Sequence, residues 1–218
     1  MRLSNSVLLV TLILLAVAEP FFPEETFGHA AYLILISAVL IAAVWASSRH
    51  RGLRIASLLL AFPTFIVAWV RHFVDDRFLS ILFLLLAAAF LVFTAVVVLR
   101  QALGKDVAVT LDTIAGAVCV YLLLAVIWAL IFSLLELVHP GSFLADGQML
   151  ASSSRHRSVS PALLYLSVET LSTLGYGDVL PVTAQARMVA AIEAIIGQLY
   201  LAVLIARLVG IEASRPRR

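Results

Sequence analysis

The residues best placed to do chemistry form the stretch Thr170-Leu-Ser-Thr-Leu-Gly-Tyr-Gly-Asp178, between two long apolar segments. Gly175 and Gly177 allow backbone conformations that a Cβ atom would forbid. Repeated unusual conformations can turn successive carbonyl groups the same way, and a column of carbonyl oxygens can replace the hydration shell of a cation. The stretch therefore predicts a cation-coordinating loop built from main-chain oxygens.

Composition places this loop in a membrane protein. The chain has 218 residues, of which 63% are hydrophobic and 13% charged, and its mean hydropathy is +1.09. These values exclude a soluble domain, and a formal charge of +2 is too small to indicate a nucleic-acid partner. The sequence contains no Gly-x-Ser-x-Gly motif and no Cys/His/Asp cluster with metal-ligand spacing. We therefore expect neither an enzyme nor an organic cofactor.

Six apolar segments are predicted to cross the membrane. They are Met1–Ala18, Ala30–Ala46, Ile55–Val70, Phe78–Leu99, Asp112–Val138 and Thr183–Val209. Between the last two, Ser160-Pro161 is typical of a helix start, and this helix ends near Ser172. Because about twelve residues cannot span a bilayer, it is predicted to be re-entrant. Phe21–His29 is predicted to be an external loop, and Ser142–Ser160 an exposed, mobile turret.

The first segment has a second interpretation. Arg2, an apolar core and Ala16-Val17-Ala18 also fit a secretory signal with a cleavage site. A retained span is the favoured alternative. With both termini inside the cell, ten of the 15 Lys and Arg residues fall on the cytoplasmic side, as the positive-inside rule requires. The sequence thus predicts a multi-pass protein of the inner (plasma) membrane.

The fourth apolar segment bears on gating. Voltage sensing requires several arginines along one membrane helix, and Phe78–Leu99 contains no charged residue. We therefore divide the chain into a four-helix transmembrane domain without gating charges, residues 1–106, and a pore domain, residues 107–218. The first four helices are predicted to be a structural or lipid-facing shell; a sensor for another stimulus is the alternative.

The pattern Thr170-x-x-Thr173-x-Gly175-Tyr176-Gly177 resembles the potassium-channel signature at every fixed position, and Ser167–Thr183 resembles the pore domain of small prokaryotic potassium channels. The resemblance implies six transmembrane helices, a re-entrant pore helix and a filter between helices five and six. Since the chain holds one filter motif, a pore also implies a homotetramer around a central axis. The carbonyls of Thr173, Leu174, Gly175 and Tyr176, with the Thr173 hydroxyl, are then expected to coordinate K⁺, and Gly177 completes the filter.

The same resemblance suggests residues that support the filter. Glu169 and Asp178 match a carboxyl-carboxylate pair that would share a proton and tune inactivation. The alternative is a solvent-facing Asp178 and a Glu169 that is only hydrogen-bonded in place. Tyr165 and Thr170 are expected to brace the filter. Leu174 replaces the usual valine or isoleucine, and Leu166 the usual tryptophan.

The last segment is expected to line the pore. Gly197 matches an inner-helix hinge, with close helix packing as the equal alternative. Gln198, Leu201 and Ile205 share one helix face, which the resemblance places on the water-filled cavity. Glu193 is predicted to point toward the pore helix or a neighbouring subunit, in a protonated or hydrogen-bonded structural role.

Two further charges belong to the cytoplasmic mouth. Asp112 and Arg207 are predicted to pair there, or to be two independent membrane-edge charges. The expected partners of the chain are further copies of itself and membrane lipid, with no nucleic acid and no soluble partner. The function predicted from these features is passive, potassium-selective conduction that is not voltage-gated. The alternatives are a subunit of a potassium uptake transporter and a weakly selective cation channel.

Overall fold

The computed structural model describes residues 4–18, 26–46, 51–74, 76–102, 104, 110–150 and 160–213. The helices in these ranges are α1 (Ser4–Ala18), α2 (Thr26–Ala46), α3 (Arg51–Phe73), α4 (Arg77–Ala102), α5 (Leu111–Val138), α6 (Pro161–Ser172) and α7 (Ala184–Ala213). The strands are β1 (Phe143–Ala145), β2 (Gln148–Met149) and β3 (Val179–Pro181). The protein is therefore largely helical, as the sequence predicted.

Local sequence explains where the central helices begin and end. Thr110 caps α5, since its side chain accepts a hydrogen bond from the backbone N–H of Thr113 and the Thr113 hydroxyl accepts one in return. Asp112 lies in the first turn, where a carboxylate interacts favourably with the helix dipole. Pro161 occupies the first turn of α6, where its missing N–H costs nothing.

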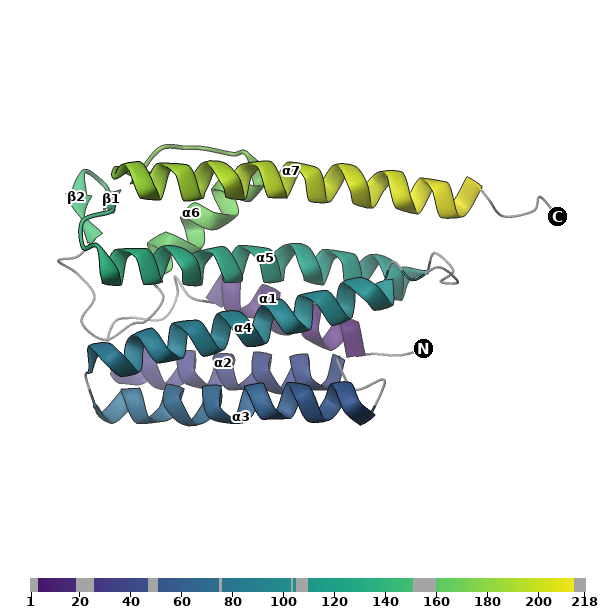
Figure 1. Cartoon of the computed structure of the whole chain (residues 1–218), viewed down its shortest axis with the longest axis horizontal. Coiled ribbons are helices and arrows are strands. Elements are labelled where there is room, and N and C mark those ends of the chain that lie inside the picture. The colour runs from purple at the N-terminus through teal and green to yellow at the C-terminus, as the bar shows by residue number, and fades with distance from the viewer. Residues whose placement is uncertain are drawn as a thin grey trace.

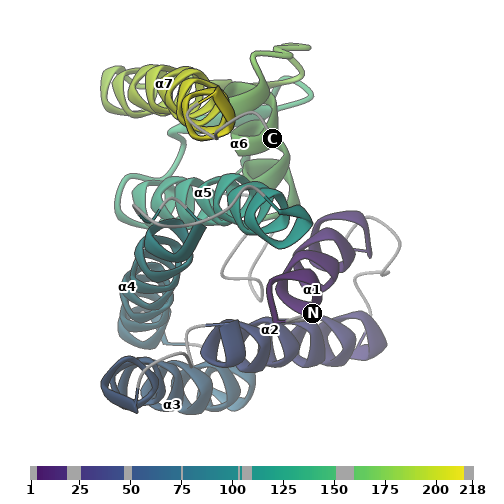
Figure 2. The same cartoon turned by 90° about the vertical axis from the view of Figure 1, so that its right-hand side faces the viewer.

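The helices form layers along one direction. α5 lies between the four N-terminal helices and α7, and the short α6 bridges α5 and α7 (Figure 2). α4 packs extensively along α5 of the same chain. Successive long helices alternate in direction, so that α1 begins and α7 ends at the same end of the molecule, opposite the strands (Figure 1). The C-terminal end of α6 packs against α7, where Leu171 meets Gly197, whereas Leu164 near its start belongs to the core formed with the N-terminal helices.

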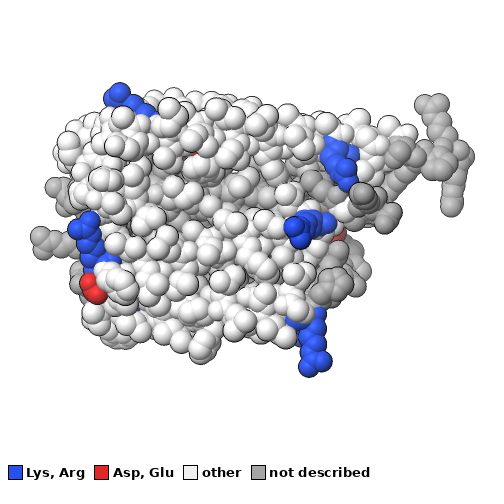
Figure 3. All heavy atoms as spheres, in the orientation of Figure 1, with Lys and Arg blue, Asp and Glu red and all other residues white. Residues whose placement is uncertain are grey.

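Four helices in the described ranges are long and apolar enough to cross a membrane. They are Arg51–Arg71, Arg77–Ala102, Leu111–Val138 and Ala184–Ile211, with shorter apolar stretches at Asn5–Leu15 and Ile34–Ala46. On the face seen in Figure 3, charged side chains gather at the two ends of the helices and leave an uncharged band between them. The chain is therefore a multi-pass membrane protein.

The largest apolar core joins the four N-terminal helices to α5. Leu8 and Leu12 of α1, Phe90 of α4 and Leu123 of α5 are all buried within it. A second, smaller core lies beneath the strands and includes Phe143. The predicted boundary between residues 106 and 107 lies outside the described residues.

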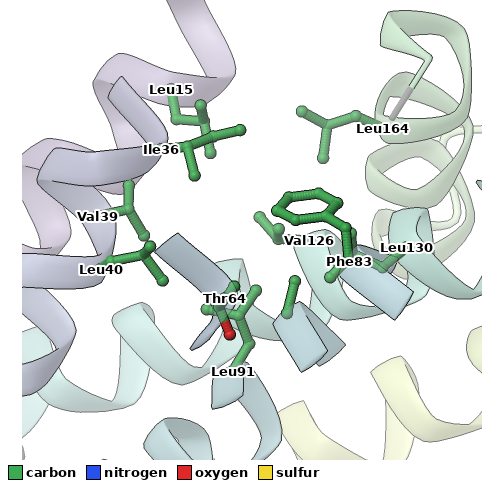
Figure 4. Close-up of a pocket in the computed structure, with 11 residues that line it drawn as sticks. Leu15, Ile36, Val39, Leu40, Thr64, Phe83, Leu91, Val126, Leu130 and Leu164 are labelled. Atoms are coloured by element: carbon green, nitrogen blue, oxygen red, sulfur yellow. The ribbon is translucent and has the colours of Figure 1, made fainter. Parts of the chain in front are cut away.

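An apolar cavity of about 50 Å³ lies where the four N-terminal helices meet α5 and α6. Its lining includes Leu15, Val39, Thr64, Phe83, Val126 and Leu164, whose side chains are drawn in Figure 4. The hydroxyl of Thr64 already donates to the carbonyl of Leu60 at 2.7 Å. Since water in such a space would find no polar partner, the cavity is expected to be dry.

Two expectations about loops were wrong. Thr26–His29 was predicted to belong to an external loop, but these residues form the first turn of α2. The turret, Ser142–Ser160, was predicted to be exposed, but Phe143–Ala145 and Gln148–Met149 form two strands and Phe143 is fully buried; residues 151–159 lie outside the described residues. The prediction did not use Asp146-Gly147, although an Asp-Gly dipeptide is a signal for a tight hairpin turn. Both residues have the positive φ angles that such a turn requires.

Candidate functional site: the loop between α6 and α7

The loop that follows α6 has an alternating backbone. Thr173, Gly175 and Gly177 have φ angles of 57°, 63° and 81°, whereas Leu174 and Tyr176 between them do not have positive φ. Left-handed residues at every second position turn successive peptide groups to the same side, which is how a main chain gathers its polar groups around an ion. The loop can therefore present a row of carbonyl oxygens to one cation path.

The loop begins directly at the C-terminus of α6. The N–H of Thr173 donates to the carbonyls of Glu169 and Thr170, and the N–H of Leu174 donates to Glu169 at 2.9 Å. A left-handed residue is a common helix C-cap, although glycine usually fills it because a side chain is strained there. Thr173, the first residue of the loop with a positive φ angle, is thus also the C-cap of α6. The end of α6 therefore fixes the residue at which the alternating backbone of the loop starts.

Glu169 lies behind the loop. Its side chain is only 2% exposed, and its Oε1 accepts a hydrogen bond from the backbone N–H of Tyr176 at 2.8 Å. Thr170 donates to the carbonyl of Leu166 at 2.7 Å and remains within its own helix. Glu169 therefore connects α6 to the middle of the loop with its side chain as well as with its carbonyl.

Comparison with protein families supplies the identity of this region. Residues 109–211 match the family described as "Ion channel". This range is 103 of the 218 residues, and over it the chain is similar to ion channels. The match points to a channel and not to an enzyme, and the matched range extends from the residue before the α5 cap to the last turns of α7. Comparisons with curated proteins and with solved structures gave no match.

Asp178 lies at the C-terminal end of the loop between α6 and α7, just before β3. It is exposed, its Oδ1 accepts from the N–H of Val179 at 3.1 Å, and the structure describes no hydrogen bond between it and Glu169. Tyr165 of α6 lies within electrostatic range of both carboxyl groups. Within one chain, the two acids are therefore related through Tyr165 and not by a direct contact.

A small three-stranded sheet holds the C-terminal end of the loop between α6 and α7. β1 pairs antiparallel with β2 and with β3, which begins immediately after Asp178. The N–H of Asp146 donates to the carbonyl of Asp178 at 3.0 Å. The side chain of Glu136, at the end of α5, accepts from the N–H groups of Gly141 and Phe143 at 2.7 and 3.1 Å. No sequence pattern indicated this role for Glu136, because its partners are loop amides.

The inner helix α7 turns one face toward α5 and α6. Glu193 and Gly197 are buried, and the hydroxyl of Tyr200 donates to the carbonyl of Ala117 at 2.6 Å. A Cβ atom at Gly197 would lie 2.7 Å from Leu171 Cδ2 and 2.9 Å from the Leu171 carbonyl oxygen. In this structure Gly197 therefore permits close packing of α7 on the end of α6.

The residues expected to line the cavity of the channel lie on other parts of α7. Gln198 and Ile205 are exposed and Leu201 is half-buried. The loop is exposed too, with Leu174 53% and Tyr176 72% accessible. The side chains of Gln198, Ile205, Leu174 and Tyr176 are therefore not covered by other described residues of the same chain.

The predicted pair of Asp112 and Arg207 at the inner mouth stays a prediction. The Oδ1 of Asp112 is buried without a hydrogen-bond partner among the described residues. The backbone carbonyl of Asp112 instead accepts a long hydrogen bond of 3.5 Å from Asn5 of α1. Asp112 thus faces α1, because its position in the first turn of α5 lies against that helix.

No group of three or more His, Cys, Asp or Glu side chains in the described part of the chain could hold a metal ion.

Proposed function

We propose that four copies of this chain form a potassium-selective channel in which Thr173, Leu174, Gly175 and Tyr176 coordinate K⁺ through main-chain oxygens. The observation that carries the proposal is the alternation of φ through Thr173, Gly175 and Gly177. Four loops arranged about one axis would surround a dehydrated monovalent cation with carbonyl groups. The C-terminus of α6 would add a partial negative charge directed toward the same path.

The exposed surfaces support a homotetramer. Apolar side chains cover much of the free surface of α7, including Met188, Ile195, Leu199 and Val203, which are 58–63% exposed. In a tetramer, part of this surface would contact neighbouring chains and part would line the pore. A head-to-tail interface that closes on itself makes such a ring. Gln198, Leu201 and Ile205 would then line the cavity below the loop.

Orientation and gating follow from charge. We place the strands outside the cell and both termini in the cytoplasm, since this orientation satisfies the positive-inside rule. Within α4 the charged side chains are Arg77 and Arg100, at its two ends. The apolar cavity where the first four helices meet α5 and α6 offers no aqueous path for a moving charge. We therefore propose that the channel does not sense voltage through these helices, which form a shell around the pore.

Reconstitution in planar bilayers tests the proposal. With potassium on one side and sodium on the other, we expect single-channel currents that reverse near the potassium equilibrium potential. Equal sodium and potassium currents would favour a weakly selective cation channel, and the absence of any unitary current would favour an uptake-transporter subunit. Gly175→Ala is the matched variant, because alanine is strained at φ 63° although no atom blocks its Cβ.

A further inference from the structure

Glu193 is a buried acid whose role the ion path does not explain. It lies on α7 within the membrane-spanning stretch and is fully buried. Its Oε1 is hydrogen-bonded to the hydroxyl of Ser167 on α6, and its Oε2 is buried without a hydrogen-bond partner among the described residues. Neither oxygen therefore meets a cation in the described part of the chain.

The Ser167 hydroxyl allows the hydrogens to be counted. Its Oγ lies within hydrogen-bond distance of Glu193 Oε1 and 2.8 Å from the carbonyl oxygen of Ala125 on α5. A hydroxyl carries one hydrogen, and a backbone carbonyl can only accept. Two full hydrogen bonds, instead of one hydrogen shared between two acceptors, require that Ser167 donates to Ala125 and that the carboxyl group of Glu193 donates to Ser167.

Burial favours the same arrangement. An ionised carboxylate inside the membrane with a single hydrogen bond is costly, whereas a neutral carboxylic acid leaves only an uncharged carbonyl oxygen unpartnered. The titratable side chains on the packed helices supply no compensating positive charge. Tyr121 of α5 is in electrostatic range of Glu193, Tyr200 donates to Ala117, and Glu169 accepts from Tyr176.

We propose that Glu193 is a neutral carboxylic acid whose proton completes a hydrogen-bond chain from α7 through Ser167 of α6 to Ala125 of α5, and that this chain positions the pore helix. Glu193 and Gly197 are one turn apart on α7, and their partners Ser167 and Leu171 are one turn apart on α6. Thr173, where the carbonyl row begins, follows Leu171 by two residues. The chain of hydrogen bonds therefore fixes the register of the helix that carries the loop, which makes Glu193 a positioning residue for the proposed conduction.

Infrared spectroscopy of the purified full chain tests the protonation directly. We expect a carbonyl-stretch band of a protonated carboxylic acid at neutral pH that is lost in Glu193→Gln. Glu136→Gln is the matched control, since Glu136 accepts from two backbone N–H groups and should not contribute this band. A spectrum in which Glu193→Gln removes no such band would overturn the proposal.

Stability and current give the second readout. Glu193→Gln keeps the shape and a donor for Ser167, so we expect its unfolding temperature and potassium current to stay close to those of the wild type. Ser167→Ala and Glu193→Ala should lower the unfolding temperature by about 4 °C or more, because they break the chain of hydrogen bonds. If Glu193→Gln is as destabilised as Glu193→Ala, the acid is an ionised acceptor and the inference is wrong.

The positioning role depends on the proposed function, but the protonation state does not. A wild-type protein that carries the band and conducts no potassium would refute the channel proposal alone. A conducting wild type without the band would refute the proton assignment alone.

Discussion

The pore region and the four N-terminal helices use their buried polar side chains differently. In the pore region, Ser167 and Tyr200 make hydrogen bonds from one helix to another. In the four N-terminal helices, the buried hydroxyls of Ser57, Thr64 and Thr94 bond to carbonyls three or four residues earlier in their own helix. Asn5 and Gln101 donate to carbonyls of other helices, and both residues lie near the ends of their own helices.

This difference indicates where geometry is held tightly. Apolar packing in a membrane permits small shifts between helices, whereas an interhelical hydrogen bond specifies which residues must meet. The region proposed to place carbonyl oxygens around an ion has the hydrogen bonds between helices, and the region proposed as a shell relies on apolar packing. Variants that disturb each kind of contact should break or sharpen this comparison.

The largest effect is expected for Gly177→Ala. An L-residue at φ 81° is strained by about 1–2 kcal/mol in each subunit, and its relaxation would rotate a carbonyl out of the row. We expect potassium-selective current to be lost in bilayer recordings. Gly147→Ala carries a similar strain at φ 76° in the β1–β2 turn and should keep selectivity. Equal loss in both variants would show that strain alone, and not the loop, is responsible.

The next largest effect is expected for Gly197→Ala. The new methyl group would overlap Leu171, so we expect a loss of about 1–3 kcal/mol in unfolding free energy of the purified protein. Gly210→Ala is the control, because no atom lies within 4 Å of its Cβ position and alanine favours the helix. A normal stability with an altered open probability for Gly197→Ala would favour the hinge interpretation instead.

A smaller effect is expected for Glu169→Ala. It removes the acceptor of the Tyr176 N–H, at a cost of about 1–2 kcal/mol, and should change the steady-state current at some external pH. Glu169→Gln retains an acceptor oxygen and should behave more like the wild type. An unchanged steady-state current in Glu169→Ala at every external pH would exclude a role for this side chain in filter inactivation.

The smallest effect is expected in the four N-terminal helices. Thr94→Val removes a hydroxyl that serves only its own helix, so the unfolding free energy should change by no more than about 0.5 kcal/mol. The comparison variant is Ser167→Ala in the pore region. If Thr94→Val is the more destabilised of the two, the proposed contrast between the regions is incorrect.

The elements that the sequence predicted well are those set by local pattern. Hydropathy located the long helices, and Ser160-Pro161 located the start of α6 within a residue. The glycines of the loop predicted unusual backbone conformations, which the structure has at Gly175 and Gly177. The order of span, short helix, loop and span therefore follows from the pattern of residues alone.

By itself, the sequence determined the membrane class, the helix order and the glycine conformations of the loop, because hydropathy and glycine conformation act over a few neighbouring residues. The tertiary structure decided which polar groups meet. It placed Asp112 against Asn5 of α1, related Glu169 and Asp178 through Tyr165, and set Glu193 on Ser167. These contacts depend on the rotation and depth of helices that are far apart in the chain, and the apolar surfaces of membrane helices encode neither.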